Sequence, residues 1–157
     1  MRFFMVFFLN LALITPSFAS TFPRGCEVSG FGYNSNYLIL NEKGDQSFYM
    51  IKNRSQSTID MEVPEQPDVF MTPKLHTRLF KEQWAAFASD IKNQPFKCFI
   101  QENDQITTID CKEVLDICRY PRVKFALSNM GNYWVSTNKG QRQVVNDAAA
   151  KGILLRW

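Results

Sequence analysis

The chain has 157 residues, of which 45% are hydrophobic and 14% aromatic, and its formal net charge is +3. That length is sufficient for one domain with a sizeable core. The charge is small and its Lys and Arg residues are scattered, so nucleic acid and anionic membrane surfaces are not expected partners.

The N-terminus has the three parts of a secretory signal peptide. Arg2 precedes an apolar run over residues 3–14, and small residues precede a predicted cut before Ser20. A membrane-spanning helix needs about 20 apolar residues, so this run is too short to remain as an anchor. We therefore expect removal of residues 1–19, which takes away one charge, and a single domain over residues 20–157. The mature protein is predicted to be periplasmic or secreted, with no membrane span.

The mature chain is predicted to consist mainly of short strands. Residues 48–52 are apolar at consecutive positions, which is typical of a central strand covered on both faces. Residues 59–63 alternate apolar and polar side chains, which predicts a hairpin with the preceding strand and one solvated face. Other expected strands are 36–41, 84–88, 123–127, 133–137 and 153–157, with a hairpin over 96–111.

Two helices are expected among these strands. Asp110 can cap a short helix near 111–118, with Glu113 completing a capping box. A C-terminal helix is expected near 141–151, with Gly152 ending it. The pattern of short strands and frequent turns favours an antiparallel β-sandwich with immunoglobulin-like architecture.

Four cysteines, all in the exported part, predict two disulfides, because export delivers them to an oxidising compartment. On the expected short helix, Cys111 and Cys118 share a face with Val114 and Leu115. Their Cα atoms would lie about 10 Å apart, beyond the ~7 Å limit for a disulfide. This pairing is therefore excluded.

The 96–111 hairpin separates the two remaining connectivities. Pairing Glu102 with Thr107 places Ile100 opposite Ile109 and Cys98 opposite Cys111, all on one face. We therefore predict the disulfides Cys98–Cys111 and Cys26–Cys118. The cysteine spacings do not fit zinc motifs.

No catalytic, cofactor-binding or metal-ligating set stands out in the sequence. His76 is the only histidine and is interpreted as a surface residue. Asp60, Glu62, Glu65 and Asp68 could supply a carboxylate pair for hydrolysis, but they are interpreted as a solvated charged face and loop. A hydrolase would be favoured by two acidic residues that converge in a cleft and have raised pKa values.

The strongest candidate for binding is the aromatic and amide-rich segment 128–134 with the strand before it. If Tyr133 and Val135 face the core, the period of two turns Trp134 outward. Aromatic anchors beside amide and basic side chains are typical of recognition surfaces. The predicted binding surface is Arg122, Lys124, Asn129, Asn132 and Trp134. The competing interpretation turns Trp134 into the core.

Five segments carry a resemblance to a known family: residues 23–28 (PRGCEV), 48–53 (FYMIKN), 68–71 (DVFM), 84–90 (WAAFASD) and 120–139 (YPRVKFALSNMGNYWVSTNK). Together they resemble the enhanced-entry protein B family, which consists of small exported proteins of Legionella-like intracellular bacteria. The similarity extends over essentially the whole mature chain. It implies a virulence role in entry into host cells, and it implies no established reaction and no catalytic residues.

These observations favour an exported, non-enzymatic binding or structural protein that contributes to envelope function or host-cell entry. Its expected partner is another envelope or host-surface protein, or a glycan, and no cofactor is expected. A small periplasmic hydrolase that uses carboxylates is the main alternative. An outer-membrane β-barrel is less favoured, because most predicted strands are shorter than the ~10 residues that barrel strands need.

Overall fold

The computed structural model describes residues 22–34, 36–64, 75–102, 105–121, 123–125 and 133–156. The predicted signal peptide and its cut before Ser20 lie outside these residues, as do Glu65 and Asp68. Within the described residues, no helix is long and apolar enough to cross a membrane.

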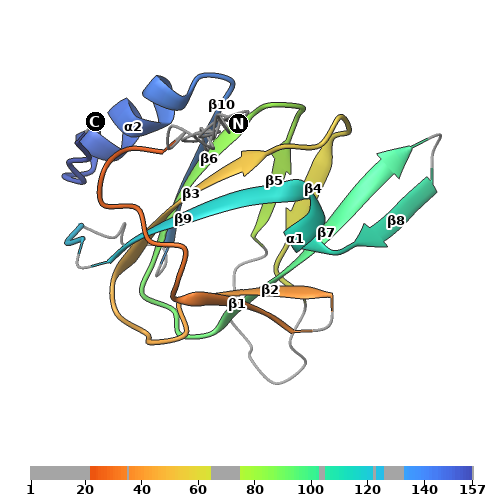
Figure 1. Cartoon of the computed structure of the whole chain (residues 1–157), viewed down its shortest axis with the longest axis horizontal. Coiled ribbons are helices and arrows are strands. Elements are labelled where there is room, and N and C mark those ends of the chain that lie inside the picture. Colours follow the sequence, from red (N-terminus) through yellow and green to blue (C-terminus); the bar gives the residue numbers. More distant parts are fainter. Residues whose placement is uncertain are drawn as a thin grey trace, which may run out of the picture.

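The strands form two antiparallel sheets (Figure 1). The six-stranded sheet consists of β1 (Phe31–Asn34), β2 (Tyr37–Leu40), β4 (Ile59–Glu62), β5 (His76–Leu79), β7 (Gln94–Glu102) and β8 (Gln105–Ile109). The four-stranded sheet consists of β3 (Ser47–Asn53), β6 (Trp84–Ser89), β9 (Leu115–Pro121) and β10 (Tyr133–Asn138). The order in the first sheet is β1-β2-β7-β4-β5, with β8 also paired to β7, and the order in the second is β10-β6-β3-β9.

The four-stranded sheet is covered on both faces. Tyr49 and Ile51 of β3 point into a core shared with the six-stranded sheet, while Phe48 and Met50 point into a second core on the opposite face. The second core is closed by the helix α2 (Gln141–Ala150), through Val144, Val145 and Ala148. The consecutive apolar residues of β3 are therefore those of a central, doubly covered strand, as predicted. The two sheets facing each other across the first core make the fold a β-sandwich.

The C-terminal helix ends as expected. Gly152 has a φ of +85°, the left-handed conformation that favours glycine, and its N–H donates to the carbonyl of Ala149 at 3.0 Å. The short helix was predicted too long, because α1 (Cys111–Val114) ends where β9 begins. Asp110 does cap it, accepting from the Lys112 N–H at 2.9 Å. Cys111 and Cys118 consequently lie in different cores instead of on one helix face.

The predicted register of the 96–111 hairpin was wrong by two residues. Cys98 pairs with Ile109, and Ile100 pairs with Thr107. A shift of two residues preserves the face on which each side chain lies. Cys111, just after β8, therefore still reaches Cys98. Both predicted disulfides are present, with Cα–Cα distances of 5.3 Å for Cys98–Cys111 and 5.4 Å for Cys26–Cys118.

Three other sequence expectations are corrected. The strands β3 and β4 do not form a hairpin, because they belong to different sheets. Residues 123–125, the described part of the expected 123–127 strand, are not in a strand. Residues 153–155 are not in a strand either. After them, Arg156 forms an isolated antiparallel bridge with Arg24.

The segment 22–30 runs beside β9 (Figure 1). The Glu27 N–H donates to the Arg119 carbonyl at 2.9 Å, and the Arg119 N–H donates back at 3.0 Å. The Tyr120 hydroxyl donates to the Pro23 carbonyl at 3.0 Å. Together with the Cys26–Cys118 disulfide, these bonds cover the outer edge of β9 with this segment.

Candidate binding surface

The structure describes two of the five residues of the predicted binding surface. Trp134 is half-buried on β10, and Lys124 is exposed in the loop before it. Arg122, Asn129 and Asn132 lie outside the described residues, so the structure does not show whether the five side chains come together.

The face of β10 that carries Trp134 is not an open one. Tyr133 and Val135 pack against the core between the sheets, as the period of two predicts. Trp134 points the other way, where it packs against the second core under α2. On the same face, the Ser136 hydroxyl donates to the Asp147 carboxylate of α2. Trp134 is therefore part of the packing of α2 as well as of the surface beside it, which combines the two interpretations of this residue.

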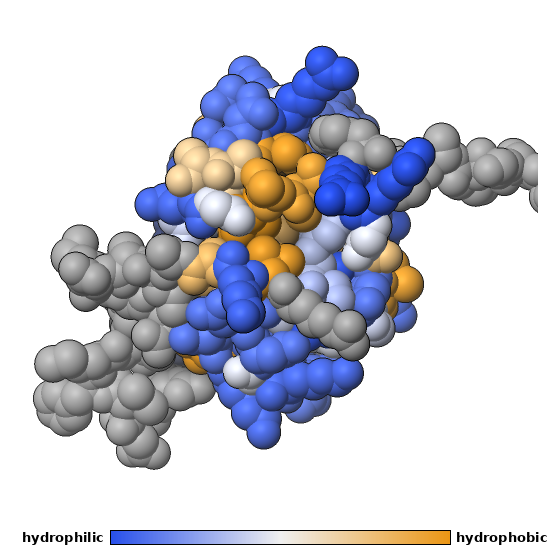
Figure 2. Space-filling view, turned by 90° about the vertical axis from the view of Figure 1, so that its left-hand side faces the viewer, coloured by the Kyte–Doolittle hydropathy of each residue, from blue (hydrophilic) through white to orange (hydrophobic). Residues whose placement is uncertain are grey.

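Other apolar side chains at the margin of the second core also keep part of their surface exposed. Val123 and Leu155 are half-buried against the second core, and Leu154 is 81% exposed. We call Val123, Trp134, Leu154 and Leu155 the α2 face. Figure 2, which looks onto the side of the molecule that carries α2, shows hydrophobic side chains gathered there and hydrophilic ones around them.

The α2 face has basic residues near it in the chain. Exposed cations are Lys124, next to Val123, Lys151, at the end of α2, and Arg156, next to Leu155. An apolar centre with a polar rim is the usual anatomy of a protein interface. The sequence pattern did not indicate Leu154, because residues 153–157 were expected only to form a terminal strand.

Asp60 and Glu62, the two described members of the acidic set considered for hydrolysis, lie beside His76 and Arg78 on the outer face of the six-stranded sheet. Arg78 donates to both carboxylate oxygens of Asp60, at 2.8 and 2.9 Å. His76 Nε2 lies 3.1 Å from Asp60 and 3.7 Å from the Glu62 carboxylate. The hydrogen bonds from Arg78 hold the pKa of Asp60 below its usual value, against the opposing effect of burial. A general acid needs a raised pKa, so this cluster does not favour the hydrolase alternative.

A buried arginine of β9 lies between Gly30 of segment 22–30 and the loop before β3. The Arg119 side chain is 3% exposed and donates to both carboxylate oxygens of Asp45, at 2.8 and 3.1 Å, and to the Ser47 hydroxyl. Gly30, at φ +84°, lies directly against it, and a Cβ there would come within 2.6 Å of the guanidinium. Burial raises the pKa of Asp45, but the Ser47 hydrogen bond and the Arg119 charge outweigh it, so this pKa lies below its usual value. The Arg119 guanidinium also lies 4.0 Å from the Glu27 carboxylate, so segment 22–30 packs against this network through Glu27 and Gly30.

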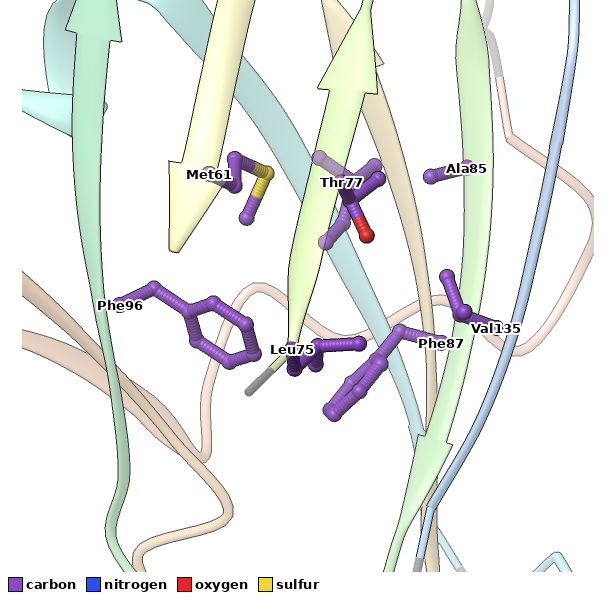
Figure 3. Close-up of a pocket in the computed structure, with 8 residues that line it drawn as sticks. Met61, Leu75, Thr77, Ala85, Phe87, Phe96 and Val135 are labelled. Carbon is purple, nitrogen blue, oxygen red and sulfur yellow. The ribbon is translucent and has the colours of Figure 1, made fainter. Parts of the chain in front are cut away.

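A small apolar cavity lies between the two sheets (Figure 3). Its side chains point toward one another from β4, β5 and β7 on one side and from β3, β6 and β10 on the other. The lining residues are Ile51, Met61, Leu75, Thr77, Ala85, Phe87, Phe96 and Val135. Thr77 is the one polar member, so this lining supplies no acid or base for chemistry.

No cluster of three or more His, Cys, Asp or Glu side chains suited to a metal ion occurs among the described residues. Comparison with protein-family models, with curated proteins and with solved structures found no match to this chain.

Proposed function

We propose that this protein is an exported, non-enzymatic binding module that contributes to envelope function or host-cell entry through its α2 face. The observation that carries the proposal is the exposure of Leu154, at 81%, next in the chain to Leu155, which is half-buried against the second core. A single exposed leucine needs no explanation, but together with the partly exposed Val123, Trp134 and Leu155 it favours a docking role.

The composition of the α2 face indicates what its partner offers. Trp134 and Leu154 are large side chains whose solvent-exposed surface can be buried when a partner docks. Tryptophan is enriched among the residues that dominate binding energies. The cations Lys124 and Lys151 suit a partner with acidic groups around an apolar patch. Such a partner is another envelope or host-surface protein, or an acidic glycan.

Two further observations support the compartment and the biology. Two disulfides indicate an oxidising environment such as the periplasm or the cell exterior. The resemblance to the enhanced-entry protein B family supports a role in host-cell entry, and the signal-peptide pattern of residues 1–19 supports export.

Site-specific photo-crosslinking in the living bacterium tests the binding role. A photoreactive residue replaces Leu154, and a matched control replaces Lys43, an exposed residue in the turn between β2 and β3. We expect one reproducible crosslinked species from position 154 and none from position 43. No crosslink from either position, or the same set of products from both, would contradict the proposal.

An infection assay tests the biology separately. In a strain lacking the protein, Leu154→Asp should fail to restore entry into host cells, while Lys43→Asp should restore it. Because Leu154 is exposed, its replacement should change the free energy of unfolding by less than about 0.5 kcal/mol. Full restoration by Leu154→Asp would show that the α2 face is not used.

A further inference from the structure

The strand β8 is an exposed edge of the six-stranded sheet. Among the described residues it pairs only with β7. Its residues 105–108 are exposed, and Ile106 is 71% exposed. The β7–β8 hairpin projects from the right of the molecule in Figure 1, away from the other strands. The backbone groups on the outer side of β8 are therefore accessible.

β8 lacks the residues that normally protect an edge strand from pairing with another strand. Its sequence, QITTI, contains no charged residue, no proline and no glycine, and three of its five residues are β-branched at exposed positions. Natural edge strands are usually blunted by charges, prolines, bulges or a covering segment. At the opposite edge of the same sheet, β5 carries His76 and Arg78. β8 differs from β5 in carrying no basic side chain.

The pairing with β7 fixes which backbone groups of β8 face outward. Glu102 and Gln105 pair across two intervening residues, so they form the hydrogen-bonded pair next to the hairpin connection. In an antiparallel ladder hydrogen-bonded and non-hydrogen-bonded pairs alternate. Ile106 and Thr108 are then in non-hydrogen-bonded pairs with β7, and their N–H and C=O groups point to the open side.

We propose that β8 is a self-association strand, which pairs antiparallel with β8 of a second copy of this chain about a two-fold axis at Thr107. In this register Ile106 lies opposite Thr108 of the second copy, and Thr107 lies opposite its own counterpart. The outward N–H and C=O groups of Ile106 and Thr108 form the new hydrogen bonds. The two six-stranded sheets become one continuous sheet.

The side chains of β8 fit a second copy. In a two-fold interface the same surface of both copies comes together, so a charged strand would bring like charges close to each other. β8 has no charged side chain, so this repulsion does not arise. On the outer face of the sheet, Phe99 pairs with Thr108, so the Ile106 side chain of the second copy extends this row. The most exposed apolar side chain of the hairpin thereby gains neighbours.

Sedimentation of the exported protein over a range of concentrations tests the pairing. Thr107→Lys and Thr107→Glu each place like charges opposite each other at the axis, and each should weaken the dimer about fivefold. An equimolar mixture of the two variants should form a heterodimer at least as tight as the wild-type dimer. Asn146→Lys, which adds the same charge on the exposed side of α2, is the matched control and should dimerise like the wild type.

A wild-type protein that remains monomeric up to millimolar concentration would overturn the proposal. So would variants that dimerise as well as the wild type, or a mixture that restores nothing. A photoreactive residue at position 107 that captures a different protein in place of a second copy would assign β8 to a partner strand, and it would also overturn the proposal. Each of these outcomes leaves the binding role of the α2 face untouched, because crosslinking at position 154 reports on that role alone.

Discussion

The outer edge of β9 is covered by another segment of the chain, whereas the outer edge of β8 is exposed, although a disulfide lies beside each strand. Segment 22–30 covers β9 through backbone bonds between Glu27 and Arg119, and the Cys26–Cys118 disulfide holds the segment there. The Cys98–Cys111 disulfide ties β7 to α1 at the base of the β7–β8 hairpin, and no other described strand pairs with the outer edge of β8. The long-range crosslink, over 92 residues, closes an edge, whereas the local one, over 13 residues, stiffens a hairpin.

The largest expected effect comes from removing the disulfide that closes the β9 edge. In the chain-entropy model a longer closed loop gives more stabilisation, so Cys26→Ala with Cys118→Ala should cost about 4–5 kcal/mol. The matched variant, Cys98→Ala with Cys111→Ala, should cost about 3 kcal/mol. Urea denaturation of both variants gives the two values. Equal losses of stability in the two variants, or a larger loss in the variant without Cys98–Cys111, would contradict the expected difference between the two edges.

The next largest effect is expected from the buried side chain of Arg119, which joins β9 to Asp45 and to Ser47 of β3. Arg119→Met removes the partner of Asp45 and Ser47, and breaking a buried ion pair typically costs about 3–5 kcal/mol. Because Asp45 is half-exposed, we expect the lower end of this range, measured by urea denaturation. Arg54→Met is the control. It removes an exposed arginine that bonds the α1 carbonyls, and it should cost less than about 1 kcal/mol. A loss at Arg119 as small as that at Arg54 would show that the buried network contributes little to the stability of the fold.

A smaller, pH-dependent effect is expected at the charged β5 edge. The pKa of Asp60 is lowered in the folded protein, chiefly by hydrogen bonds from Arg78. This contribution to stability is therefore present above the unfolded pKa, near 3.9, and is lost as the pH falls through the folded pKa. Asp60→Asn should be less stable than the wild type at pH 6, and the difference should shrink toward pH 2. Arg78→Gln should reduce the same pH dependence, and an unchanged profile in both variants would contradict the assignment.

Parts of the fold could be predicted because local pattern and burial agree in them. The apolar run of β3, the position of α2 and the glycine after that helix were predicted correctly. The disulfide pairing was also right, because the register error in the β7–β8 hairpin was two residues and a strand returns to the same face after two. The immunoglobulin-like connectivity, the signal peptide and the family resemblance stay predictions.

Other parts could not be predicted because they depend on contacts between distant segments. Cys111, Val114, Leu115 and Cys118 have helical spacing, yet pairing with β3 makes residues 115–121 a strand buried on both faces. The spacing of β3 and β4 resembles a hairpin, and nothing local indicates that the two strands join different sheets. For Trp134, the period of two gave the correct side of β10, but the coverage of that side by α2 depends on a helix that follows later in the chain.

Amide hydrogen exchange, measured residue by residue, tests the contrast between the two edges most directly. We predict strong protection of the Glu27 and Arg119 amides, whose hydrogen bonds join segment 22–30 to β9. The Ile106 and Thr108 amides should exchange fast in dilute solution, because these groups face the open side of β8. Their protection should rise with protein concentration as β8 pairs with a second copy. Fast exchange at Arg119, or protection of Ile106 and Thr108 that is the same at every concentration, would contradict the account.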